Sequence, residues 1–103
     1  MKVLCENKGH QIRIYLSGEL DHNFAKGVMK SIDELIDEYL PRECVLDMRQ
    51  LNFMDSSGIA VILRTDKHMA QIGGRMWVEN CGGQALRVLD AAGINRIVKV
   101  LSK

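Results

Sequence analysis

Apolar and polar residues alternate near the start of the chain, which is the pattern of a half-buried strand. Between Gln11 and Ser17 every second residue is apolar, so one face of this segment is expected to be buried. The preceding segment Lys2–Asn7 predicts another strand, and Lys8–His10 predicts a tight turn between the two. Together they predict an N-terminal hairpin. The apolar residues of its second strand are Ile12, Ile14 and Leu16.

After the hairpin, apolar residues recur at steps of three and four, which predicts an amphipathic helix. Asp21 is expected to cap its N-terminus, and Pro41 to end it, because proline cannot continue a helix. The predicted buried stripe consists of Phe24, Val28, Ile32, Leu35, Ile36 and Tyr39.

The central third of the sequence predicts a strand, a loop and a second helix. Cys44–Leu46 reads as a short buried strand leading to Asp47, and Arg49–Asp55 as a loop. Ile59–Ile72 predicts an amphipathic helix, which Gly73-Gly74 would end. The residues expected to face inward are Ile59, Ile62, Met69 and Ile72, and those expected to face water are Ala60, Arg64, Lys67 and Gln71.

The remaining segments complete an order of strands and helices typical of a mixed sheet. Arg75–Glu79 predicts a strand, Gln84–Ala92 a short helix with Leu86 and Leu89 inward, and Ile97–Leu101 a last strand. The order ββαβαβαβ indicates a single α/β domain over residues 1–103, with an antiparallel hairpin followed by parallel crossover units and helices packed on the sheet. If the inner strands are parallel neighbours, the loops that carry Asp21, Asp55 and Cys81 lie along one edge, where such sheets place their sites.

Composition excludes several classes of function. The chain has 103 residues, a net charge of +1 and 26% charged residues, with no basic stripe, so we expect no nucleic-acid partner. No segment is long and apolar enough for a signal peptide or a membrane span, which predicts a cytoplasmic protein. Cys5, Cys44 and Cys81 have neither metal-ligand nor disulfide spacing and are expected to be reduced core residues.

The segment Asp55-Ser56-Ser57-Gly58 places two hydroxyl groups where a loop turns into the second helix. The first N–H groups of a helix lack intrahelical partners and lie at the positive end of its dipole, so this is a favourable place for a phosphate. Capping alone also explains an Asp-Ser pair before a helix. The residues by themselves leave both interpretations open, and Asp55 fits either one.

No catalytic residue, metal site or cofactor site is predicted. A hydrolase nucleophile elbow requires Gly-x-Ser-x-Gly, but position 54 is Met, and none of the three histidines has an evident orienting partner. Neither Gly73-Gly74 nor Gly82-Gly83 is followed by the Lys-Ser/Thr of a phosphate-binding loop. We therefore expect a protein that is not an enzyme.

Three segments together identify a likeness to a known family. Gly18–His22, Phe53–Ile59 and Asp90–Ile94 resemble, in order and spacing, the STAS domain of bacterial anti-sigma factor antagonists, most of all the sporulation type that acts on sigma F. Relatives of that type usually continue past the last strand into a further helix, whereas this sequence ends at Ser102-Lys103.

The resemblance implies a phosphorylation switch on Ser56. In the family, the unphosphorylated protein binds an anti-sigma factor that is also a serine kinase and so releases the sigma factor, which it affects only indirectly. Phosphorylation of the serine after the Asp ends this binding, and a serine phosphatase reverses it. The residues that the resemblance implies at the partner-binding surface are Asp21, His22, Asp55, Ser57, Gly58, Ile59, Ala60 and Arg64.

Two alternatives remain from the sequence. One is a STAS antagonist of a different circuit, such as the general stress response or a signalling complex. The other is a receiver-like domain phosphorylated on Asp, although receivers carry paired acids after their first strand and this chain has Asn7-Lys8 there.

Overall fold

The computed structural model describes residues 1–103 and contains five strands, three α-helices and one 3₁₀ turn. In chain order they are β1 (Lys2–Lys8), β2 (Gln11–Leu20), α1 (His22–Tyr39), β3 (Glu43–Met54), α2 (Ser56–Gln71), β4 (Arg75–Cys81), α3 (Gly83–Ala92), η1 (Ile94–Arg96) and β5 (Val100–Ser102).

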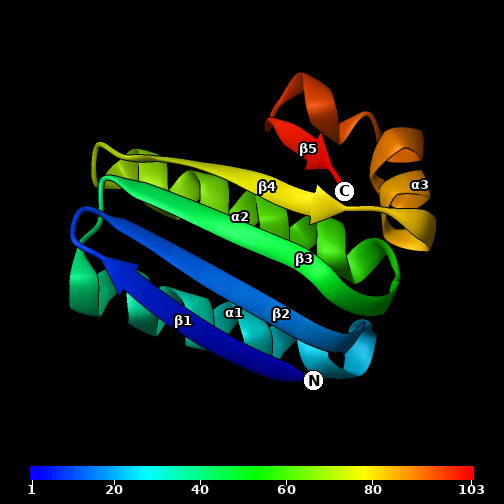
Figure 1. The fold of residues 1–103 in the computed structure, drawn as a ribbon, viewed down its shortest axis with the longest axis horizontal. Coiled ribbons are helices and arrows are strands. Elements are labelled where there is room, and N and C mark those ends of the chain that lie inside the picture. The colour runs from blue at the N-terminus through cyan, green and yellow to red at the C-terminus, as the bar shows by residue number, and fades with distance from the viewer.

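The strands form one mixed sheet in the order β1-β2-β3-β4-β5. β1 and β2 pair antiparallel, and each later neighbour pairs parallel, which confirms the predicted fold class. Figure 1 shows α1 and α2 behind β1–β4, and α3 beyond the end of β3 and β4. The turns that follow β2, β3 and β4 therefore meet at one edge of the domain.

The predicted loop Arg49–Asp55 was wrong, because β3 continues as a strand as far as Met54. Two register shifts let it stay paired with β2, between Tyr15 and Ser17 and between Gly18 and Glu19. These irregularities break the alternation of apolar and polar residues, which is why the pattern hid the strand. The predicted strand Ile97–Leu101 was also misplaced, since β5 covers only Val100–Ser102.

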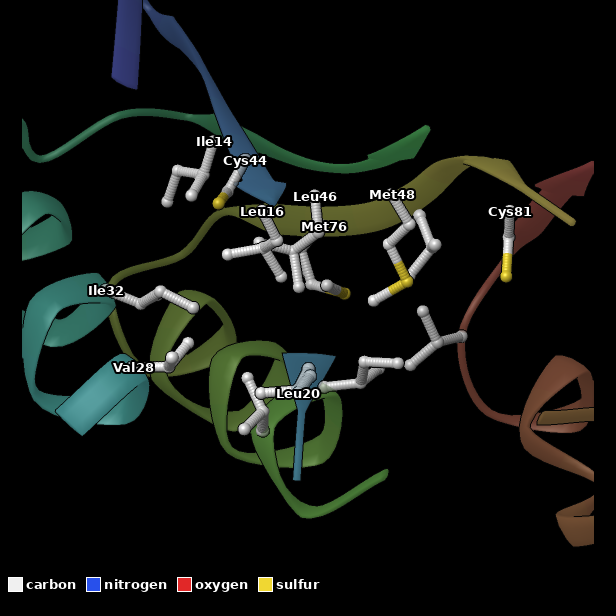
Figure 2. Packing of buried hydrophobic residues seen from close by; sticks show 14 of the residues in the cluster. Ile14, Leu16, Leu20, Val28, Ile32, Cys44, Leu46, Met48, Met76 and Cys81 are labelled. Atoms are coloured by element: carbon white, nitrogen blue, oxygen red, sulfur yellow. The ribbon is translucent and has the colours of Figure 1, made fainter. Parts of the chain in front are cut away.

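The hydrophobic core lies between the sheet and the two long helices. Alternate residues of β2 and β3 point toward α1 and α2, among them Ile14, Leu16, Cys44 and Leu46 (Figure 2). The alternation of apolar residues in Gln11–Ser17 therefore predicted the buried face of β2 correctly, and Cys44–Leu46 is buried as predicted. The helix residues buried against this face are Ala25, Val28, Ile32 and Ile36 of α1 and Val61, Ile62, Thr65 and Met69 of α2.

Three apolar residues predicted to be buried are substantially exposed. Phe24 and Tyr39 lie in the first and last turns of α1, and Ile72 follows α2; their exposed fractions are 43%, 38% and 37%. Each stands at a helix terminus, beyond the part of the helix that the sheet covers. Helical periodicity gives a direction around the axis but not the end of the covered surface.

Cys44 and Cys81 are core residues, as predicted, but the prediction was wrong for Cys5, which is only partly buried because it lies on the edge strand β1. No disulfide joins any of the three. Burial raises the pKa of the Cys44 thiol to about 12 and that of Cys81 to about 11, so both remain protonated and unreactive at neutral pH. None of the helices combines the length and the apolar character needed to cross a membrane.

A charged cluster joins α1 to α2 on their outer side. Arg64 donates from Nε and Nη2 to one oxygen of Asp33, at 3.0 and 2.8 Å. His68 places Nδ1 2.8 Å from the other oxygen of Asp33 and Nε2 2.9 Å from Asp37. Partial burial acts to lower the pKa of His68, but its two carboxylate partners outweigh that effect and raise it above 6.5. The geometry therefore favours a protonated imidazole that links the two helices.

We expect the free energy of unfolding to depend on the titration of His68. A raised folded-state pKa means that the stabilisation is fully present below about pH 6.5 and is lost as the pH rises through the folded value. Chemical denaturation from about pH 6 to about pH 9 should therefore show a fall in stability that His68→Gln reduces. His10→Gln, at the β1–β2 turn, is the matched control, and an unchanged pH slope in His68→Gln contradicts the assignment.

Candidate functional site

The candidate site lies where β2 and β3 end side by side. Leu20 and Met54 are register partners, and the Asp55 N–H donates to the Leu20 carbonyl at 3.2 Å. An aspartate follows each strand, Asp21 after β2 and Asp55 after β3, and a helix begins at the next residue in both cases. The parallel pairing thus brings the N-termini of α1 and α2 together.

The Asp55 carboxylate connects these two helix N-termini. Its Oδ1 accepts from the Ser57 N–H of α2 at 2.8 Å, and its Oδ2 accepts from the His22 N–H of α1 at 3.0 Å. The Ser57 and His22 N–H groups hold the pKa of Asp55 below its ordinary value, although desolvation acts in the opposite direction. Asp55 is therefore ionised at neutral pH and fixes both helices relative to the turn between them.

Asp21 caps only its own helix, as predicted from the sequence. Its Oδ1 accepts from both the Asn23 N–H, at 2.9 Å, and the Phe24 N–H, at 3.3 Å. The two aspartates thus differ in geometry: one oxygen of Asp21 makes both of its bonds, whereas Asp55 uses one oxygen for each helix.

Ser56 is the first residue of α2 and is exposed to solvent. The following N–H groups are partly occupied, since Ser57 donates to the Asp55 side chain and Gly58 donates to the Asp55 carbonyl at 3.0 Å. Ser57 itself is only partly exposed. Of the two hydroxyl groups, the one on Ser56 is therefore the more accessible for modification by a second protein.

Gly58 is buried against the side chain of Met54. A Cβ at this position would lie 2.5 Å from Met54 Cγ and 2.8 Å from Met54 Sδ. Met54 is itself fully buried, so its side chain has little room to move. The missing side chain of Gly58 therefore allows α2 to begin directly over the end of β3.

The other predicted surface residues extend away from Ser56. His22 is exposed at the start of α1. In the first turns of α2, Ile59 is partly exposed and Ala60 is exposed. Arg64 lies two turns further along α2, about 12 Å from Ser56 at 1.5 Å per residue, and is paired with Asp33. The structure thus brings Asp21, His22 and Asp55–Ala60 together, with Arg64 at a distance.

One contact of the site was missed in the sequence. The Gln84 side chain, in the first turn of α3, bonds both backbone groups of Met54: Oε1 accepts from the N–H at 2.9 Å, and Nε2 donates to the carbonyl at 2.7 Å. A polar residue near a helix start gives no signal of a backbone partner 30 positions away. Only the fold brings the two together.

A second polar cluster lies on the helix-free face of the sheet. The buried Asp47 carboxylate accepts from Arg13, from Asn80 and from the Arg49 N–H, and Arg13 also pairs with Glu79 at 2.8 Å. The charged and polar groups of this cluster pair with one another. We therefore assign the cluster a role in stabilising the sheet. No group of three or more His, Cys, Asp or Glu side chains is arranged so that it could hold a metal ion.

Comparison with known proteins gives a consistent assignment. The family model described as the STAS domain matches residues 3–103. An anti-sigma F factor antagonist from Paenibacillus polymyxa is 39% identical over 102 residues, covering 97% of this chain and 87% of the relative. An anti-sigma-B factor antagonist from Bacillus subtilis is 26% identical, covering 100% and 93%.

Solved structures agree on the fold. The unphosphorylated form of the anti-sigma factor antagonist SpoIIAA superposes with a TM-score of 0.82 at 22% identity, over 99% of this chain and 90% of that one. The phosphorylated form of the Bacillus cell fate determinant SpoIIAA superposes with a TM-score of 0.72 at 22% identity, over 99% and 93%.

Replacing Asp55 by Asn should destabilise the protein more than replacing Asp21 by Asn. An amide has one acceptor oxygen, which can reproduce both bonds of Asp21 but only one of the two bonds of Asp55. In the Asp55→Asn variant the amide nitrogen would instead face a helix N–H. Urea denaturation of both variants measures the difference, and equal midpoints would contradict the bridging role of Asp55.

Gly58→Ala should lower the free energy of unfolding by about 1–3 kcal/mol, because the added methyl group overlaps the buried Met54 side chain. Gly27→Ala is the matched control: it lies in α1 with nothing within 4 Å of the added Cβ, and should stabilise by about 1 kcal/mol through helix propensity. Thermal or urea denaturation measures both free energies of unfolding. If the stabilities of the two variants shift in the same direction, the packing argument is refuted.

Proposed function

Because this chain belongs to the STAS domain family, we propose that it acts as an anti-sigma factor antagonist whose binding is switched off by phosphorylation of Ser56. One observation carries the proposal: an exposed serine opens α2 at the point where Asp55 joins the N-termini of two helices. The 39% identity to an anti-sigma F factor antagonist supports the sporulation type over the sigma-B type, to whose antagonist the identity is 26%.

The proposed partner is an anti-sigma factor with serine kinase activity. It binds the unphosphorylated protein, and in doing so gives up its sigma factor, with which this chain makes no contact of its own. It then transfers the terminal phosphoryl group of ATP to the Ser56 hydroxyl, leaving ADP, and dissociates. A serine phosphatase hydrolyses the phosphoserine and restores the active form. The protein contributes a substrate hydroxyl and a surface, and all catalytic groups belong to the kinase and the phosphatase.

Phosphate on Ser56 suits a switch that blocks binding and leaves the fold intact. The modification adds about −1.5 to −2 charges at the surface, where the positive ends of two helix dipoles partly compensate it. The same charge lies next to the ionised Asp55, so the turn becomes strongly anionic. A partner packed on this turn would have to desolvate that charge, which strongly disfavours binding.

The proposed interface is centred on the turn and includes the start of both helices. Asp21 and His22 contribute from α1, and the segment Asp55–Ala60 contributes from α2, with the exposed ring of Phe24 as an apolar contact beside them. Arg64 belongs to the outer margin of this surface, since its guanidinium already pairs with Asp33.

Two alternative functions differ in how well the structure supports them. A STAS antagonist of another circuit shares this site and differs only in which kinase fits it, so the identity of the captured kinase distinguishes them. A receiver-like domain phosphorylated on Asp is disfavoured, because the chain opens with an antiparallel hairpin and matches the STAS domain over residues 3–103.

Phosphopeptide mapping after incubation with the kinase and ATP should place the phosphate on Ser56. Ser56→Ala should remain folded, bind the kinase and accept no phosphate, because only the hydroxyl group has been removed from an exposed position. Ser57→Ala is the matched control and should still be phosphorylated. Phosphate found on Ser57 alone would overturn the assignment, and so would loss of kinase binding in a folded Ser56→Ala variant.

A further inference from the structure

β3 loses its neighbour before it reaches the site. β3 and β4 pair from Glu43 and Arg75 to Asp47 and Glu79, and there the pairing ends. Asn80 then adopts a left-handed backbone conformation, φ 59°. Its side-chain Nδ2 donates to Asp47 Oδ2 at 2.9 Å. β4 turns away at this point and continues beside β5, as Figure 1 shows. The last residues of β3 therefore run on with a strand on one side only.

At Met54 the unpartnered side of β3 carries both backbone groups. The neighbouring Asp55 N–H points toward β2, where it donates to the Leu20 carbonyl. Successive residues of a strand direct their backbone groups to opposite sides, so the N–H and carbonyl of Met54 point to the side that β4 has left. Met54 is fully buried, and unpaired backbone groups in a buried position are costly.

Gln84 occupies the place of the absent strand. A side-chain amide has the same donor and acceptor groups as a peptide, and here its oxygen accepts from the Met54 N–H while its nitrogen donates to the Met54 carbonyl. We infer that Gln84 is the positioning residue of the phosphorylation turn: it holds the backbone of Met54, two residues before Ser56, against α3.

The positioning role of Gln84 rests on the proposed function, because only that function makes the turn important. The hydrogen bonds between Gln84 and Met54 are independent of it. If Gln84 is removed, the end of β3 keeps its bonds to β2 and loses those to α3. The turn should then sample several conformations, of which the kinase recognises one. The apparent affinity of the kinase for the protein then falls in proportion to the population of the recognised conformation, whereas phosphoryl transfer in the bound complex is unaffected.

The test uses Gln84→Met, which keeps the length of the side chain and removes both hydrogen bonds. Amide hydrogen exchange should become about tenfold faster at Met54, the scale of one net hydrogen bond, and stay unchanged at Leu46, where β3 pairs with both β2 and β4. Gln11→Met is the matched control, because Gln11 bonds Glu43 at the opposite end of the same strand pair and should leave Met54 unaffected. Unchanged protection of Met54 in Gln84→Met overturns the inference.

Steady-state phosphorylation by the kinase gives the second readout. Gln84→Met should raise KM several-fold and leave kcat unchanged, since the bound turn is ordered in both proteins. Gln84→Glu keeps an acceptor for the Met54 N–H, and protonation of its carboxyl group restores the donor. Its Met54 protection should therefore recover toward the wild-type value as the pH is lowered.

The two readouts separate the two proposals. If the kinase leaves even the wild-type protein unmodified, the proposed function fails, and the exchange data still decide the role of Gln84. An equal loss of protection at Met54 and Leu46 would mean that Gln84 serves only general stability. A fall in kcat with unchanged KM would mean that Gln84 acts in the bound complex. Either result would overturn its role in positioning the free turn.

Discussion

The structure around the site depends on one carboxylate shared by two helices. Asp55 accepts one N–H group from the first turn of α1 and one from the first turn of α2, one on each oxygen, and the parallel pairing of β2 with β3 brings those helices within its reach. The interaction satisfies donors that neither helix can satisfy internally, and it fixes the direction in which each helix leaves the sheet. Ser56 owes its exposed position at the start of α2 to this arrangement.

Three contacts converge on the residues around Ser56 and restrain the turn. Asp55 ties it to α1, Gln84 ties it to α3, and the absent side chain of Gly58 lets Met54 pack beneath α2. A restrained turn suits the proposed function, in which one place is recognised twice, as a binding surface and as a substrate. Under that proposal, a phosphate would abolish binding through local charge and bulk without a rearrangement of the fold.

The sequence allowed most of the fold to be predicted, because its signals were local. The alternation of Ile12, Ile14 and Leu16, the cap at Asp21 and the Asp-Ser pair before α2 each follow from backbone geometry within a few residues. The end of β3 was missed because its register with β2 shifts twice. Gln84 was missed because its partner is a backbone 30 residues away, which no periodicity records. The exposed ends of α1 were missed because burial there depends on the extent of the sheet.

We propose that one phosphate on Ser56 decides whether the protein binds an anti-sigma factor kinase. Calorimetric titration of the unmodified protein and of the stoichiometrically phosphorylated protein into the same kinase-type anti-sigma factor tests it directly, with circular dichroism to confirm that both forms are folded. The account predicts tight binding of the unmodified form and an affinity at least about tenfold lower for the phosphorylated form. Equal affinity of two folded forms would contradict it.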